Sequence, residues 1–255
     1  MRSIWNGSIN FGLVNIPIKL YSAIESSSLD LDMLDSRDHS RIRFKRVNEK
    51  TNEEVPFEKI VKGYLLKDEY VILEDQDFED ASPEKTKVID IQNFVKKEDI
   101  NPMLFETSYY AEPGKAGQKA YSLLINALNK SKLAGLGSFV LRQKENLCVI
   151  YPQNNILIIS RIRYAQEIKS PSEINLPNQI TIPKRELDVA LTLINQYTSD
   201  FDISNFKDTY HDELLKIIKL KAQGKRPTIK KLNPKKAKSD DLYEQLLESL
   251  NKKGA

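Results

Sequence analysis

Every second side chain is aliphatic in the stretch Val14-Asn15-Ile16-Pro17-Ile18-Lys19-Leu20. Because successive side chains of a β-strand point to opposite faces, the four aliphatic side chains share one face, which predicts a strand buried on one side. Pro17 has no amide hydrogen to donate to a neighbouring strand, so we expect it at a sheet edge or at a bulge.

Similar runs on the C-terminal side of this stretch predict more strands. In residues 41–47 the cationic side chains at 41, 43 and 45 would project from one face, while Ile42 and Phe44 would be buried on the other. Shorter β-rich runs cover residues 139–142, 147–151 and 156–159, with hairpin-like breaks at 144–146 and 152–155. The last run continues into Ser160-Arg161-Ile162-Arg163-Tyr164, which repeats the alternation of arginine and apolar residues.

Three segments have helical periodicity. Residues 114–131 carry an apolar stripe, Pro183 fits the first turn of a helix that runs to about residue 197, and Gly224 would end a helix over 207–223. The expected stripe of the first helix consists of Ala116, Ala120, Leu123, Leu124, Ala127 and Leu128. Since the last two helices follow the strands and do not alternate with them, the predicted fold class is α+β.

Basic residues are concentrated near the C-terminal end. Residues 216–238 hold ten lysines and arginines and no acidic residue. Removing these ten from the 39 basic residues of the chain leaves 29 against 36 acidic residues, so the remainder is negatively charged. A run of this kind either binds a polyanion or forms a solvated linker.

The composition excludes several kinds of chemistry. The chain has one cysteine and two histidines, too few for an intramolecular disulfide or a four-ligand zinc site. A nucleophile activated by histidine would need His39 or His211, which we expect in a polar turn and on an ordinary helix face. No apolar run reaches the roughly 18 residues of a membrane span, and no secretory signal is evident, so we expect a cytoplasmic protein without membrane partners.

The acidic run at 74–80 was considered as a metal site. It lacks the central glycine and distal glutamate of a calcium loop, and a solvated helix N-terminus is the favoured interpretation. A metal-dependent nuclease would have to use Asp75, Asp77 and Glu79, or Glu167 with Lys169, but no strand-anchored spacing joins them. We therefore expect no enzyme activity, no cofactor and no metal.

The C-terminal segment regains a helical period. Leu242, Leu246 and Leu250 would share one face, flanked by Tyr243 and Leu247. A helix of about a dozen residues is marginal alone in water, so this one either folds back onto the body or docks in a groove of a partner. We favour docking to a partner.

The opening segment, residues 1–23 (MRSIWNGSINFGLVNIPIKLYSA), resembles the start of the bacterial Ku proteins, the DNA-end-binding factors of non-homologous end joining. The likeness continues at 41–47, at Val61-Lys62-Gly63-Tyr64, at Tyr109-Tyr110, at 119–124 and at 210–214, and it covers residues 1 to about 224. Leu65-Leu66 departs from the pattern, because an acidic residue is expected after Gly63-Tyr64.

The resemblance implies a β-barrel with bridging strands, which pairs with a second copy into a ring around a duplex end. On this basis we expect a core and bridge at 1–180, a helical arm at 181–224, a basic linker at 225–238 and a partner-binding segment at 239–255. It also implies that the last segment recruits the ATP-dependent DNA ligase of the pathway, ligase D, and that the protein is associated with the nucleoid.

The resemblance and the charge pattern together nominate the residues that contact DNA. A ring that slides must hold phosphates and ignore bases, which suits Arg and Lys on rigid strands. The strongest candidates are the cations of the two alternating runs, Arg41, Arg43, Lys45, Arg161 and Arg163. The weaker candidates are Lys62, Lys115, Lys119, Arg142 and Lys144, and Arg46 is also expected to contact DNA. The alternative is a generic polyanion-binding protein that acts through residues 216–238.

Overall fold

The structure is a computed structural model of the whole chain, and it describes all residues except 26, 82–86, 143, 178–179, 226–240 and 254–255. The predicted basic linker therefore lies almost entirely outside the described residues. The chain divides into two units, Met1–Ser26 with Leu31–Ser170, and Ser27–Asp30 with Pro171–Ala255. Each unit is described by itself.

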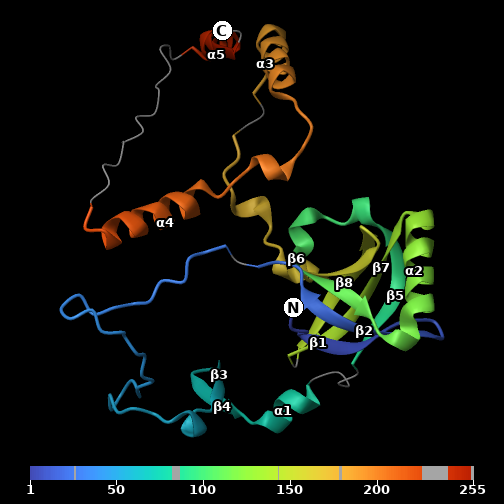
Figure 1. The fold of residues 1–255 in the computed structure, drawn as a ribbon, viewed down its shortest axis with the longest axis vertical. Helices are drawn as coiled ribbons and strands as arrows, with labels where there is room; N and C mark the ends of the chain where they lie inside the picture. Colours follow the sequence, from blue (N-terminus) through green and yellow to red (C-terminus); the bar gives the residue numbers. More distant parts are fainter. Residues whose placement is uncertain (26, 82–86, 143, 178–179, 226–240, 254–255) are drawn as a thin grey trace. The chain divides into compact units, whose positions relative to one another are not determined.

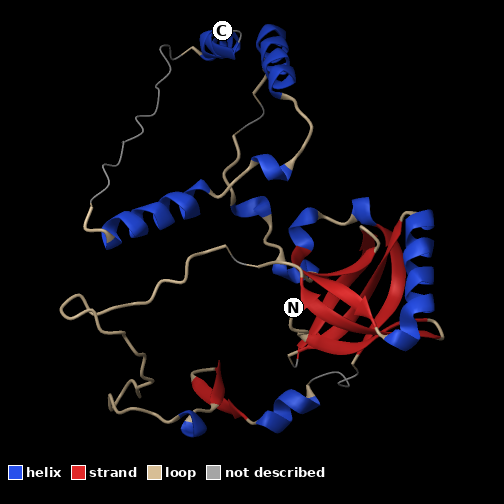
Figure 2. Cartoon of the chain, in the orientation of Figure 1, coloured by secondary structure: helices blue, strands red, loops and turns tan. Residues whose placement is uncertain are grey.

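Seven strands of the first unit form a closed barrel in the order β1-β2-β6-β9-β8-β7-β5, which confirms the expected α+β class (Figures 1 and 2). All neighbours are antiparallel except β1 and β5, which pair in parallel. The strands are β1 Trp5–Phe11, β2 Val14–Ser22, β5 Val88–Lys96, β6 Phe105–Pro113, β7 Leu133–Leu141, β8 Lys144–Gln153 and β9 Ile156–Ile162.

The alternation in β2 behaves as predicted. Ile16, Ile18 and Leu20 are buried in the core, and Lys19 between them is exposed. The pairing of β2 with β6 begins at Ile18, so Pro17 lies at the end of that ladder, and its carbonyl accepts a hydrogen bond from the Gly114 amide at 2.8 Å. The missing donor of Pro17 therefore costs no hydrogen bond between strands.

The first residues of β1 are fixed by an aromatic contact. The Trp5 indole N–H donates to the Val140 carbonyl at 3.1 Å, and its ring meets Phe139 edge to face with centroids 5.8 Å apart. Gly7 lies directly beneath that ring, since a Cβ there would be 2.3 Å from the indole and 2.2 Å from the Lys87 carbonyl. The close packing of Trp5 and Gly7 thus holds the start of β1 against the adjoining parts of the barrel.

The turns between β7, β8 and β9 correct one prediction and confirm another. Residues 144–146, expected as a break, belong to β8, and the chain turns at Arg142, which has a left-handed φ of 52°. The second break is confirmed only in its second half: Pro152 and Gln153 belong to β8, and Asn154 and Asn155, with φ angles of 50° and 62°, form a two-residue hairpin turn. A polar run such as residues 144–146 can form part of a strand when a neighbouring strand is available to pair with it. Hydrophobic periodicity alone does not reveal whether such a neighbour is present.

Helix α2, Gln118–Ser131, follows the short 3-10 turn η4, Lys115–Gly117, and packs on the barrel wall (Figure 1). Its buried side chains are Tyr121, Leu124, Ile125 and Leu128. Three residues expected on the buried stripe, Ala116, Leu123 and Ala127, are exposed, so that part of the prediction is wrong. Compared with the expected stripe, the buried face of α2 is shifted so that it includes Tyr121. The Tyr121 hydroxyl has hydrogen-bond partners in β6 and β9.

The Tyr121 hydroxyl joins two strands. It donates to the Ala111 carbonyl of β6 at 2.6 Å and accepts from the Leu157 amide of β9 at 2.8 Å, and burial raises its pKa. Ala111 and Leu157 are paired residues at the end of the β6–β9 ladder. The side chain therefore satisfies two buried backbone groups where the two strands stop bonding to each other.

Between β2 and β5 the chain leaves the barrel, and we call residues 31–81 the excursion. It contains the 3-10 turn η1 Phe57–Lys59, the hairpin of β3 Lys62–Leu66 with β4 Glu69–Leu73, and helix α1 Asp75–Asp80. No residue of the excursion is buried. The strand expected over 41–47 is wrong: only isolated bridges join Leu34 to Arg41 and Val47 to Glu54. No neighbouring strand lies beside the segment, and Ile42 and Phe44 are 46% and 80% exposed.

The described residues of the second unit include three α-helices, α3 Lys184–Tyr197, α4 Thr209–Ala222 and α5 Leu242–Lys253. All three are predicted by the sequence, and Gly224 ends α4 as expected. Pro183, expected in the first turn of α3, is its N-cap, one residue before the helix begins. Gly224 has a φ of 73°, its amide donates to the Lys221 carbonyl, and the Lys225 amide donates to the Leu220 carbonyl, both at 3.0 Å. This is a Schellman C-cap, for which glycine is the favoured residue.

Several single 3-10 turns link these elements. They are η2 Lys97–Asp99, η3 Pro102–Leu104, η5 Ala165–Glu167, η6 Pro171–Glu173 and η7 Ile203–Asn205. Within the described residues, no helix is both long and apolar enough to cross a membrane.

The Tyr121 bridge predicts a measurable contribution to stability. Replacing Tyr121 with Phe keeps the ring but leaves the Leu157 amide and the Ala111 carbonyl without their partner, so we expect the free energy of unfolding to fall by about 1–3 kcal/mol. Urea denaturation measures the loss. The control is Tyr64→Phe, because Tyr64 is 65% exposed and should be neutral. Equal stability of the two variants would contradict the bridging role.

Candidate nucleic-acid interface

The cations of the excursion are exposed but mostly paired nearby. Arg41 contacts Asp32 at 2.8 Å and Lys45 contacts Glu54 at 2.6 Å, and the hydrogen bond to Glu54 raises the pKa of Lys45. Exposed pairs of this kind are weak and readily exchanged for another anion. The Arg41 and Lys45 side chains can therefore reach a phosphate without disturbing any buried packing.

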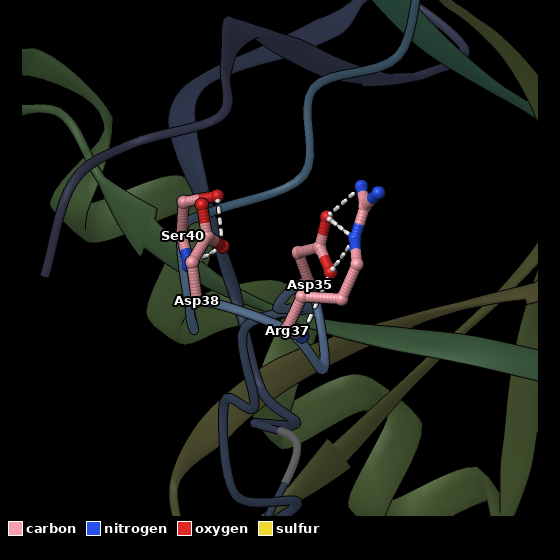
Figure 3. A network of polar contacts seen from close by, with 4 residues as sticks. All are labelled: Asp35, Arg37, Asp38 and Ser40. Atoms are coloured by element: carbon pink, nitrogen blue, oxygen red, sulfur yellow. Dashed lines mark hydrogen bonds and ion pairs between the residues drawn. The ribbon is translucent and has the colours of Figure 1, made fainter.

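A compact polar turn precedes Arg41 (Figure 3). The Arg37 guanidinium binds both carboxylate oxygens of Asp35, and the Ser40 amide and hydroxyl both donate to Asp38, at 2.9 and 2.8 Å. These contacts hold the pKa values of Asp35 and Asp38 below their usual range. His39 lies in this turn with a φ of 59°, as the sequence predicted for a polar turn. Local polar contacts thus shape the excursion in place of an apolar core.

Two further cations of the excursion lie over aromatic rings. The Arg46 guanidinium is 5.4 Å from the Phe57 ring centroid, and the Lys62 ammonium is 4.3 Å from that of Phe78. Arg43 has no hydrogen bond or ion pair with any residue that the structure describes, and it is exposed. Among the cations predicted in this segment, Arg43 is the one most available to an external anion.

The second predicted cationic run lies on the barrel. The Arg161 Nε donates to Glu106 at 2.6 Å, and Arg163 lies 3.5 Å from the same carboxylate and donates to the carbonyls of Met103 and Phe105 at 3.0 and 2.9 Å. Ile162 between them is buried, so the expected alternation is confirmed. Glu106 compensates part of the positive charge, which the sequence analysis did not anticipate.

Three predicted cations converge on one cavity at an end of the barrel. Arg142, Lys144 and Arg161 line a space of about 600 Å³ together with Tyr109 and Asn146. Lys115 and Lys119 are exposed in η4 and at the start of α2 and are not among its lining residues. The cavity brings together cations of β9, of the β7–β8 turn and of the start of β8.

Sequence reasoning missed three residues of this region: Glu106, Tyr109 and Asn146. Glu106 comes near Arg161 because the β6–β9 register shifts between Phe105 and Ser108. A register shift leaves no mark in hydrophobic periodicity, so no available signal would have located that carboxylate. Tyr109 and Asn146 have polar groups in otherwise apolar or turn-like runs, and only the closed barrel shows where those groups point.

Two of the acidic residues considered for a nuclease, Asp77 and Glu167, accept backbone hydrogen bonds at the starts of short helical turns. Glu74 and Asp77 form a capping box at the start of α1, which confirms a helix N-terminus in the acidic run, and the Glu167 carboxylate accepts from the Tyr164 amide at 2.7 Å. His211 lies in α4, where its amide donates to Asp208, the N-cap of that helix, at 3.0 Å. The described residues contain no group of three or more metal-ligating side chains.

The sequence matches the family model described as the Ku70/Ku80 beta-barrel domain over residues 10–189, which includes most of the barrel and the start of α3. This chain belongs to the Ku family. The resemblance seen in its opening segment is thereby confirmed. The closed seven-stranded barrel agrees with the domain that the family model describes.

Curated relatives of this Ku-family chain carry the name "Non-homologous end joining protein Ku". The protein from Opitutus terrae is 38% identical over 259 residues, covering 100% of this chain and 93% of the relative. Those from Archaeoglobus fulgidus and Bacillus subtilis are 36% and 35% identical, and cover 88% and 90% of this chain and 90% and 75% of the relatives.

Proposed function

We propose that this chain binds the ends of double-stranded DNA as a homodimeric ring in non-homologous end joining, and that it recruits the ATP-dependent DNA ligase D. The observation that carries the proposal is its membership of the Ku family along nearly its whole length, with relatives named for that pathway. The candidate interface supports it, because its exposed cations can neutralise phosphates without reading bases.

The proposed contact with DNA is electrostatic. Arg41, Arg43 and Lys45 of the excursion are exposed, and their partners within the chain are absent or weak. A duplex carries a phosphate charge about every 1.7 Å of its axis, so a phosphate is always close to an exposed cation on the protein. Such a cation can replace its carboxylate partner with a phosphate at little cost in free energy. Binding of this kind is independent of sequence and sensitive to salt.

The proposed homodimer rests on the unburied apolar side chains of the excursion. Phe44, Phe57, Tyr64 and Tyr70 are each at least 65% exposed, and residues on both faces of the β3–β4 hairpin are exposed. Exposed apolar patches of this size mark interaction surfaces on soluble proteins. A second copy of the chain would cover them and would supply the other half of a ring.

The proposed ligase contact uses the apolar stripe of α5. Tyr243, Leu246 and Leu250 are half-buried, while Leu242 and Leu247 are 55% and 37% exposed. The helix lies beside α3 within the second unit, and the Arg185 guanidinium sits 3.7 Å from the Tyr243 ring centroid (Figure 1). An amphipathic helix with such a stripe suits a groove on a partner, and the exposed leucines would make the first contact.

Neutralising Arg43 tests the electrostatic contact. We expect Arg43→Gln to weaken binding to a blunt duplex and to lower the slope of log affinity against log salt by about one to two, since a dimer would lose two phosphate contacts. Fluorescence anisotropy over a salt series measures both. The control is Lys130→Gln, which removes one exposed charge from α2. If binding instead vanishes when the lysines and arginines of the basic run 216–238 are neutralised, and is unaffected by Arg43→Gln, the generic polyanion binder is correct.

A charge placed in the hairpin tests the homodimer. Leu65 is 53% exposed in β3, and we expect Leu65→Asp to convert a dimer into a monomer, because a buried unpaired carboxylate would be costly in the interface. Light scattering at micromolar concentration measures the mass, and circular dichroism checks the barrel. The matched control is Leu13→Asp in the β1–β2 turn, where Leu13 is fully exposed. A wild-type monomer would overturn the ring.

Changing one leucine of α5 tests ligase recruitment. We expect Leu242→Asp to weaken coprecipitation with the ligase by about tenfold and to leave DNA-end binding unchanged, because an interface leucine contributes only when desolvated. Glu244→Gln, two residues away, is the control. Ligase binding that survives both Leu242→Asp and deletion of 239–255 would refute the role of this segment.

A further inference from the structure

The cavity at the end of the barrel has the features of a built anion site. Its polar lining comes from separate strands and a turn: Ser22 of β2, Thr107 and Tyr109 of β6, Arg142 in the β7–β8 turn, Lys144 and Asn146 of β8, and Arg161 of β9. Because these elements belong to one closed barrel, their relative positions are fixed by the strand ladders. A preformed site costs little to organise when a ligand arrives.

The charge of the cavity is one-sided. Three of its lining residues are cations, and none of the lining residues that the structure describes is acidic. Arg142 and Lys144 form no ion pair with any residue described in the structure. Glu106 binds the Nε of Arg161 from outside the lining set, at 2.6 Å, which orients the guanidinium and leaves its two terminal nitrogens for another acceptor. The balance of charge in the cavity therefore calls for an anion.

Tyr109 provides an independent observation. The residue is only 5% exposed and its ring belongs to the core, yet its hydroxyl has no hydrogen-bond partner among the described residues. Every fully enclosed side-chain oxygen or nitrogen in the described part of the chain does have a partner, so this hydroxyl is not fully enclosed, and Tyr109 is one of the residues that line the cavity. Asn146, 7% exposed, donates to the Lys144 carbonyl at 2.6 Å and fixes the start of β8 beside it.

We propose that this cavity binds a phosphoryl group. Arginine presents a planar fork that matches two phosphate oxygens, lysine supplies a point charge and a tyrosine hydroxyl can donate to a third oxygen. The volume of about 600 Å³ exceeds that of one phosphate, so the group would belong to a larger molecule. Two sources share this chemistry, a free oligophosphate and the 5′-phosphate at the end of a DNA strand. Only the second source rests on the proposed function.

The test uses the full chain and tripolyphosphate as the free probe, titrated by calorimetry at low salt without DNA. The variant Arg142→Gln/Lys144→Gln should bind at least about tenfold more weakly, and Tyr109→Phe, which keeps the ring, about three- to tenfold more weakly. The control Lys19→Gln/Lys130→Gln removes the same charge from exposed sites on β2 and α2. Urea denaturation confirms that each variant is folded.

A second arm compares a duplex ending in 5′-phosphate with one ending in 5′-hydroxyl. If tripolyphosphate binding depends on Tyr109, Arg142 and Lys144, the cavity is a site for a free oligophosphate. If a preference for the 5′-phosphate duplex depends on the same residues, the cavity is a site for the end of a DNA strand. Loss of binding to the same extent in the control, or the absence of both effects, overturns the proposal. Failure of DNA-end binding alone would overturn the proposed function and leave the free-ligand site intact.

Discussion

The hydrogen bond from the Ser8 amide to the Lys87 carbonyl, 2.9 Å long, begins the parallel pairing of β1 with β5 that closes the barrel. Closure removes both free edges of the sheet. It also fixes the end of β2 and the start of β5, the two points between which the excursion leaves the barrel. The Trp5 ring and the glycine beneath it protect this closure. The pairing of β1 with β5 therefore gives a rigid barrel, and the excursion is a long loop that is attached to the barrel at both ends.

That tethered loop explains why the excursion is built as it is. It has no core of its own, and polar contacts such as Arg37 with Asp35 hold its turns. Such a segment becomes ordered when its apolar side chains meet another surface and its cations meet phosphates. The barrel, in contrast, carries its cations on fixed strands, and Glu106 holds two of them in place.

Much of the fold could be predicted from periodicity, and the failures share a cause. The alternation in 14–20 gave a buried face that the barrel confirms, because a closed sheet supplies a cover for every strand. In β9 the residues from Leu157 to Ser160 are buried without alternation, and only the last part alternates, with Ile162 buried between two arginines. The same alternation in 41–47 has no cover within the chain, and no regular strand forms there. The Tyr121 bridge and the Glu106 pair depend on the register between distant strands, which a single sequence does not reveal. The proposed DNA contacts and the α5 contact remain predictions.

Competition for a linear duplex, at near-physiological salt, tests the central claim most directly. Labelled linear DNA bound to the full chain is challenged separately with the same unlabelled duplex and with closed circular DNA, at equal base-pair concentration. A ring that threads onto ends predicts that linear DNA competes and circles do not. Equal competition by circles would contradict end binding and make the protein a general polyanion binder.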